Sequence, residues 1–422
     1  MSATSPRPSY AAVLRIPYAR RTFAAVLVGR LSYGMVPVAV LLAVTRTTGS
    51  YAVAGTVMAL FGATSVLLSP ARAALVDRYG PRRALLPMAS LYAVLLGTLA
   101  VTSWRPGASG PVLGAVAVAA GACTPPLGPT MRTVWSELAA DRGLLRRAYS
   151  LDGVAEELLF VSGPLAVGGV VQFAAPAAAV LLGAVLVVAG TFGFVTSPAV
   201  ARMPGRVPAP KGATGVRRPR VVAGIMPPVV VAGGVGLALG ALDLLVLAFA
   251  EQRGHGDDVV AWIFAALSAG SAVGGLLYGS VEWRSGARVR LSLLTAGLGF
   301  ALAGAGLAPD LATLTGAVVC AGLFVAPALT TAYLVADESV PSGARTQAGA
   351  WVNTAVNAGI SAGAAASGLL VAHFSPPLGF ALAGATALLA AIAVGVGRRQ
   401  GRAGESETGV AEGVAERTGE PR

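Results

Sequence analysis

The feature that most constrains this chain is a series of long apolar blocks, each as long as a helix that crosses a membrane. Such a helix needs roughly 20 apolar residues to cross about 30 Å of hydrocarbon. Only 12% of the 422 residues are charged, and the mean hydropathy is +0.72. Soluble domains carry about 25% charged residues. The composition therefore excludes a soluble multidomain enzyme, and it also excludes a disordered chain, which needs low hydrophobicity.

Twelve blocks reach this length, and none shows the alternation of a transmembrane strand. We therefore predict an all-α integral membrane protein. Its twelve transmembrane helices are expected over residues 22–44, 52–71, 84–104, 112–131, 150–173, 177–197, 227–249, 259–281, 289–308, 311–335, 347–373 and 377–397.

The placement of the basic residues predicts the orientation and the domains. With the N-terminus inside, 27 of the 31 basic residues fall on the cytoplasmic side, and the exceptions are Arg30, Arg46, Arg105 and Arg253. Both termini of this multi-pass protein of the plasma membrane are then cytoplasmic. The predicted divisions are an N-terminal segment 1–21, a six-helix bundle 22–197, a basic linker 198–226, a second six-helix bundle 227–397 and a disordered tail 398–422.

A shift of 201 residues lays the fourth and fifth spans over the tenth and eleventh. The matched pairs are Gly121 with Gly322, Pro126 with Pro327, Glu137 with Glu338, Asp152 with Asn353, and Glu156 with Asn357. Two parallel six-helix repeats joined by a basic linker are an arrangement of secondary transporters.

Between the second and third spans, residues 73–83 read AALVDRYGPRR. This stretch resembles the loop signature of the major facilitator superfamily, glycine-x-leucine-x-aspartate-arginine-x-glycine-basic-basic. It departs from the signature at Ala73 and Pro81, and a decayed copy lies at 279–288. The resemblance covers 22–397 and implies two bundles that rock about a midplane cavity.

A second stretch, 163–169, is similar to the Gly-Pro-x-x-Gly-Gly element of antiporters in this superfamily, with one extra residue before the glycine pair. It favours a drug/proton-antiporter-like protein, although ordinary packing of small residues explains the stretch equally well.

The resemblance implies that the loop between the second and third spans holds the two bundles together on the cytoplasmic side. The expected latch residues are Asp77, Arg78, Gly80, Arg82 and Arg83. Their expected partner is the inner end of the eleventh span, near Arg345 to Asn353, because a carboxylate is stabilised at a helix N-terminus. The alternative is a basic loop that only sets the topology.

Six charged residues fall within or at the ends of spans, where an ion costs about 2.5–3.5 kcal/mol unless it is paired or solvated. These candidates for proton coupling or buried ion pairing are Arg30, Arg132, Asp152, Glu156, Glu157 and Asp243. Three acids against two bases in the first half leave one carboxylate that could bind a proton, whereas a purely structural network is the alternative. Asp243 has no basic residue in its span and lies either unpaired in the membrane or solvated near the outer mouth.

The resemblance implies that the first, fourth, seventh and tenth helices line the central cavity. The sequence favours breaks at Gly34–Pro37, at Pro125–Pro126 and at Pro327, and a seventh helix loosened by glycines. The expected cavity residues are Tyr33, Thr124, Tyr333, Asn353 and Asn357, together with Asp243. Because few ions are expected in this cavity, it suits a lipophilic or amphipathic solute.

We therefore expect a secondary active transporter that works by alternating access, with proton-coupled export of a small lipophilic compound such as a drug or secondary metabolite. Uptake of a neutral nutrient by the same fold, or a non-transporting membrane partner or sensor, are the alternatives. The expected partners are the small-molecule substrate, protons and the lipid bilayer, with a monomer and no nucleic acid.

We expect no enzyme, no cofactor and no metal site. Cys123 and Cys320 stand among small apolar residues, and His255 and His373 have no partners at metal spacing. A Gly-x-Ser-x-Gly pattern at 359–363 lies within a span, not at a strand-to-helix turn, so packing accounts for it better than nucleophilic catalysis.

Overall fold

The computed structural model describes residues 9–104, 107–203, 217–254, 257–371 and 377–395, and within these ranges the regular structure is helical, with no strand. The predicted all-α class is confirmed. The first part of the chain forms α1 (Tyr10–Arg15), α2 (Ala19–Thr48), α3 (Tyr51–Leu67), α4 (Ser69–Tyr79), α5 (Pro81–Thr102), α6 (Gly110–Cys123), α7 (Leu127–Leu138), α8 (Arg142–Val171), α9 (Pro176–Val195) and α10 (Pro198–Ala201). The second part forms α11 (Arg217–Gln252), α12 (Asp257–Ser280), α13 (Ala287–Ala305), α14 (Leu311–Glu338), the short 3-10 helix η1 (Ser342–Ala344), α15 (Arg345–Val371) and a last helix, Pro377–Gly395.

Nine helical segments among the described residues are long and apolar enough to cross a membrane; α6 and α7 together form one of them. The bent pair α3 and α4 makes a tenth if it is counted as one span. The remaining two predicted spans correspond to α13 and α15. Arg288 and Arg290 lie in the first turn of α13, and Asn353 with Asn357 lies within α15, so polar side chains lower the hydropathy of both helices. The number twelve remains a prediction.

The helix breaks differ from those expected. The fourth predicted span is broken at residues 124–126, where Pro125 and Pro126 separate α6 from α7. An unexpected bend of 42° separates α3 from α4 in the second span. In contrast, α2, α11 and α14 are continuous helices that contain Pro37, Pro227–Pro228 and Pro327. The breaks expected in the first and tenth spans were wrong, because a bilayer helix tolerates proline when neighbouring groups satisfy its backbone.

The glycines of the seventh span do not loosen α11 but seat it against α15. A methyl group added at Gly236 would collide with the carbonyl oxygen of Val356, and one at Gly240 with that of Ile360. On the facing side, Gly359 and Gly363 lie against the backbone of α11, so packing accounts for the Gly-x-Ser-x-Gly pattern. Small residues permit such close approach of helices in a bilayer.

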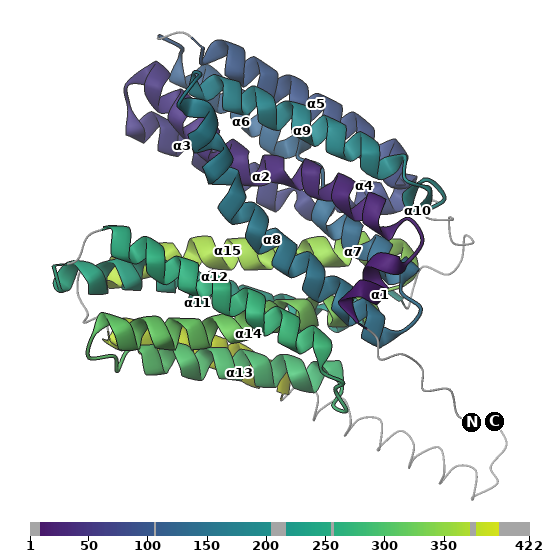
Figure 1. Ribbon diagram of the computed structural model, residues 1–422, viewed down its shortest axis with the longest axis vertical. Helices are drawn as coiled ribbons and strands as arrows, with labels where there is room; N and C mark the ends of the chain where they lie inside the picture. Colours follow the sequence, from purple (N-terminus) through teal and green to yellow (C-terminus); the bar gives the residue numbers. More distant parts are fainter. Residues whose placement is uncertain (1–8, 105–106, 204–216, 255–256, 372–376, 396–422) are drawn as a thin grey trace, which may run out of the picture.

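Figure 1 shows α2, α3, α5, α6 and α9 together in one part of the molecule, and α11 to α14 in another, with α8 running from one to the other. Within the first part α2 packs on α9, α3 on α6 and α5 on α9, and within the second α11 packs on α15 and α12 on α14. Contacts of α8 with α12, and of α15 with α4 and α7, join the two parts.

The internal repeat is visible in this packing. A methyl group at Gly121 of α6 would meet the carbonyl oxygen of Phe61 in α3, and one at Gly322 of α14 would meet that of Leu267 in α12. The matched glycines therefore serve the same purpose in the two parts. In the antiporter-like element, Gly163 lies against Gly34 of α2, whereas the Cβ positions of the glycine pair at 168–169 have no neighbour within 4 Å among the described residues apart from their own helix backbone.

The ends of the chain depart from the predicted divisions. The N-terminal segment contains the short helix α1, and α11 begins at Arg217, inside the predicted linker. Residues 204–216 of that linker and the predicted tail 398–422 lie outside the described residues.

Candidate functional site

Two arginines and two acids form a closed ring of ion pairs between α2, α7 and α8. The nitrogens of Arg30 lie 2.8 Å from Asp152 Oδ1 and 2.9 Å from Glu156 Oε1. The nitrogens of Arg132 lie 3.3 Å from Asp152 Oδ2 and 2.6 Å from Glu156 Oε2. Two positive and two negative charges thus balance. Asp152 is completely buried, whereas 33% of the Glu156 side chain is exposed.

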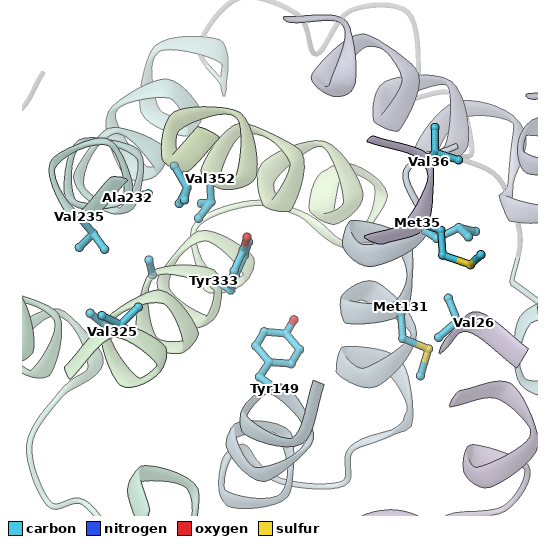
Figure 2. Close-up of a cluster of buried hydrophobic side chains, with 14 of the residues drawn as sticks. Val26, Met35, Val36, Met131, Tyr149, Ala232, Val235, Val325, Tyr333 and Val352 are labelled. Carbon is cyan, nitrogen blue, oxygen red and sulfur yellow. The ribbon is translucent and has the colours of Figure 1, made fainter. Parts of the chain in front are cut away.

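The ring is buttressed by aromatic side chains from both parts of the molecule. The guanidinium of Arg132 lies over the ring of Tyr333 in α14, 3.8 Å from its centroid, and the Tyr149 hydroxyl donates a hydrogen bond to the carbonyl oxygen of Arg132. Figure 2 shows Tyr149 and Tyr333 between Met35 and Met131 on one side and side chains such as Val235 and Val325 on the other. Tyr333, which was expected in the cavity wall, is instead buried beside the ion-pair ring.

A cavity of about 300 Å³ lies beside this ring, at the helix breaks. The structure brings Tyr33, Thr124, Asn353 and Asn357 to its wall, together with three members of the ring. Apolar residues, including Met58, Phe61 and Phe160, line the rest. Asn353 and Asn357 are the repeat partners of Asp152 and Glu156, so the same two helix positions carry charge in α8 and neutral amides in α15.

The residue that the sequence did not reveal is Arg72 of α4, which was counted among the cytoplasmic basic residues. It is 6% exposed and lies at the cavity wall. Its Nη1 donates to the carbonyl oxygens of Gly121 (2.8 Å) and Ala122 (3.2 Å) at the end of α6. Its Nη2 donates to the carbonyl oxygen of Ser65 in α3. The helix break supplies these acceptors, because carbonyls at a helix end lack partners within the helix. The expectation of a cavity with few ions was therefore wrong.

Glu157 and Asp243 lie apart from the ring. Glu157 accepts a hydrogen bond of 3.0 Å from the Ser271 hydroxyl of α12, across the contact between the two parts of the molecule. Asp243 is exposed on α11 and is not among the residues that line the cavity beside the ring.

A second cluster lies where α4 meets α15. The Asp77 carboxylate accepts hydrogen bonds from the backbone N–H groups of Thr346 (3.2 Å) and Gln347 (2.8 Å), in the first turn of α15. A carboxylate at this place is favoured by the free N–H groups and by the helix dipole. Asp77 belongs to the last turn of α4, and Gly80 alone separates α4 from α5, so the connection between the second and third spans is mostly helical.

Further bonds surround this contact. Arg345 lies 3.0 Å from Glu137 and 3.4 Å from Asp337, and its Nη1 donates to the Ser136 hydroxyl. The hydroxyls of Thr133 and Thr346 are 3.1 Å apart. These contacts tie α7 and α4 of the first part to α14 and α15 of the second.

The other predicted latch residues have different positions. Gly80 has φ +85°, which favours glycine, and its N–H closes α4 by donating to the Val76 carbonyl. Arg78, Arg82 and Arg83 are exposed, and Arg78 lies 5.1 Å from the ring centroid of its neighbour Tyr79.

The decayed copy of the signature makes a related contact. Arg146, near the start of α8, donates a 2.5 Å hydrogen bond to the carbonyl oxygen of Val281, just beyond α12. Tyr10 of α1 donates to the carbonyl oxygen of Leu276 in α12, at 2.6 Å. Burial raises the pKa of this tyrosine, so it remains a neutral donor.

The comparisons with known proteins agree with this architecture. The family model described as Major Facilitator Superfamily matches residues 22–256 and 228–416. No functionally curated protein has significant sequence similarity to the chain.

Two solved structures are similar in fold. The first is a bacterial homologue of the iron transporter ferroportin in an outward-facing state, with a TM-score of 0.69 and 13% identity over 90% of this chain and 97% of that one. The second is the human organic anion transporter MFSD10 (TETRAN), with a TM-score of 0.68 and 16% identity over 92% of this chain and 100% of that one. At these identities the likeness establishes the fold alone. Since the family model spans most of the sequence, the chain belongs to the Major Facilitator Superfamily.

Proposed function

We propose that this protein is a secondary active transporter that works by alternating access and exports small lipophilic compounds in exchange for protons. In this proposal twelve spans form two six-helix bundles in the plasma membrane, with both termini in the cytoplasm. The family and the multi-pass helical fold support transport in general, while substrate, direction and coupling are inferred from the site.

The observation that carries the proposal is a cavity between two groups of helices, with several of the polar contacts between the groups lying at one end. Asp77 with α15, Arg345 with Glu137, and Arg146 with Val281 all lie at the end that the basic residues mark as cytoplasmic. Bonds that close one side of a central cavity are what a two-state rocking mechanism requires. We assign this arrangement to the state whose cavity faces outward.

Glu157 is our candidate for the proton carrier. Asp152 and Glu156 each contact two arginines, so binding a proton there would break ion pairs. Glu157 instead accepts from the neutral Ser271 hydroxyl on the opposite group of helices. A proton on Glu157 would change this contact between α8 and α12, which links protonation to the relative position of the two groups. The exposed Asp243 is the second candidate.

The test is transport by the purified protein in vesicles with an imposed pH gradient, using a lipophilic cation, a neutral lipophilic compound and a lipophilic carboxylate as probes. We expect at least one probe to move against its gradient when protons flow the other way. Glu157→Gln should abolish dependence on the proton gradient but retain exchange of the probe down its own gradient. Glu251→Gln makes the same substitution at an exposed glutamate. It is the control and should behave as wild type.

The outcomes separate the alternatives. Movement of a probe with the protons, and not against them, would favour uptake. A purified protein that moves no probe in either direction would favour a non-transporting partner or sensor and contradict the proposal.

A further inference from the structure

Arg72 carries a charge that the ion-pair ring does not balance. Arg30, Arg132, Asp152 and Glu156 neutralise one another. Arg72 is only 6% exposed, yet among the described residues no acidic side chain forms an ion pair with it. One positive charge therefore remains at the cavity wall.

The backbone bonds of Arg72 explain its position but not its charge. Its three acceptors among the described residues are carbonyl oxygens near the ends of α3 and α6, and its Nε is buried without a hydrogen-bond partner there. A neutral donor such as glutamine could satisfy carbonyls without the cost of burying a full charge. In a membrane protein, a buried ion without a counter-ion indicates a functional site.

The surroundings of Arg72 define what the counter-ion could be. Tyr33, Tyr92 and Thr124 line the same cavity, and Met58 and Phe61 provide an apolar surface. The volume of about 300 Å³ is at the lower end of the range for ligand pockets. A small molecule with one anionic head and an apolar body matches both the single charge and the apolar surface.

We propose that this cavity binds small amphipathic monoanions, with a carboxylate held at Arg72 and the apolar part against Met58 and Phe61. This inference rests on the proposed transport function and narrows its substrate class. Guanidinium is suited to this task because it forms paired hydrogen bonds with a carboxylate.

The experiment compares equilibrium binding of radiolabelled 1-naphthoate and its neutral analogue 1-naphthamide to the purified full-length protein. We expect wild type to bind the naphthoate at least tenfold more tightly than the amide. Arg72→Gln should remove this preference, by weakening naphthoate at least tenfold and leaving the amide unchanged, and Arg72→Lys should retain part of it. Arg46→Gln, which removes an exposed cation at the end of α2, is the matched control and should bind both probes as wild type does.

The wild-type comparison tests the proposal even if Arg72→Gln fails to fold. Equal affinity for the two probes, or binding of neither, would overturn it, as would a preference that survives in folded Arg72→Gln. Binding that depends on Arg72 without any transport in vesicles would contradict the transport function and leave the site assignment intact. Transport of a neutral probe without binding of naphthoate would contradict the site assignment and leave the transport function intact.

Discussion

The ion-pair ring makes a quantitative prediction about stability. Asp152→Asn keeps the shape of the side chain and one oxygen that can accept from Arg30, but it removes one of two negative charges. Two buried arginines then share the single acid Glu156. Loss of one partner from a buried ion pair costs about 3–5 kcal/mol, because the remaining charge is uncompensated. We expect a loss in this range, since Asp152 is completely buried and contacts both arginines.

The variants at Glu156 and Arg30 test whether charge balance is the cause. Glu156→Gln should cost less than Asp152→Asn, because 33% of the Glu156 side chain is exposed and solvent compensates part of the loss. The double variant Arg30→Gln with Asp152→Asn removes one charge of each sign. Its cost should fall short of the sum of the two single costs by about 0.5–3 kcal/mol.

The measurement is equilibrium unfolding in mixed micelles with increasing SDS, followed by helical circular dichroism. The exposed Glu251→Gln is the control for a change of net charge alone. An Asp152→Asn protein that unfolds within about 0.5 kcal/mol of wild type, or strictly additive costs in the double variant, would refute a ring held by mutual neutralisation.

Three further predictions concern the ends and the packing of the helices. Asp77→Asn should weaken the cap on α15 and so open the contact between α4, α7 and α15. A cysteine introduced at Ser136, which lies in this contact, should then react faster with a thiol reagent. Asp310→Asn, which removes a carboxylate cap from α14, is the control and should leave that rate unchanged. Gly240→Ala should destabilise the protein by about 1–3 kcal/mol in SDS unfolding because its methyl group collides with Ile360, while Gly304→Ala, with no neighbour within 4 Å, should not; equal effects would contradict the packing of α11 on α15. Hydrogen bonds from Thr313 lower the pKa of Asp310, so the stability that this charged cap adds should be present at neutral pH and disappear as the pH falls through that lowered pKa. A stability difference between wild type and Asp310→Asn that does not change with pH would contradict it.

The sequence predicted the helices well because a bilayer imposes a length and a composition on each span. The predicted spans 150–173 and 177–197 correspond to α8 and α9, and the predicted helix 377–397 is observed over Pro377–Gly395. Proline was a poorer guide. It breaks the span at Pro125–Pro126, yet Pro37 and Pro327 remain inside helices, because tertiary contacts decide whether the backbone around a proline is satisfied.

The residues of the candidate site were predicted where a motif or a charge within a span marked them. Asp77 was expected to face the start of the eleventh span, and the structure places it there. Arg72 escaped notice because it stands five residues before Asp77, in what looked like the basic end of a span. Its side chain reaches the carbonyl oxygens of α6 from the start of α4, just after the bend that follows α3, and no local pattern predicts that approach.

If the two groups of helices rock about the cavity, as we propose, distances at the two ends of the molecule must change in opposite directions. In a variant without Cys123 and Cys320, one spin-label pair would join Ala140 to Ser285 at the predicted cytoplasmic end, and another would join Tyr51 to Gln252 at the opposite end; all four positions are exposed. On introduction of Asp77→Asn, we predict that the first distance lengthens while the second shortens. Two distances that stay constant, or that change in the same direction, would contradict alternating access.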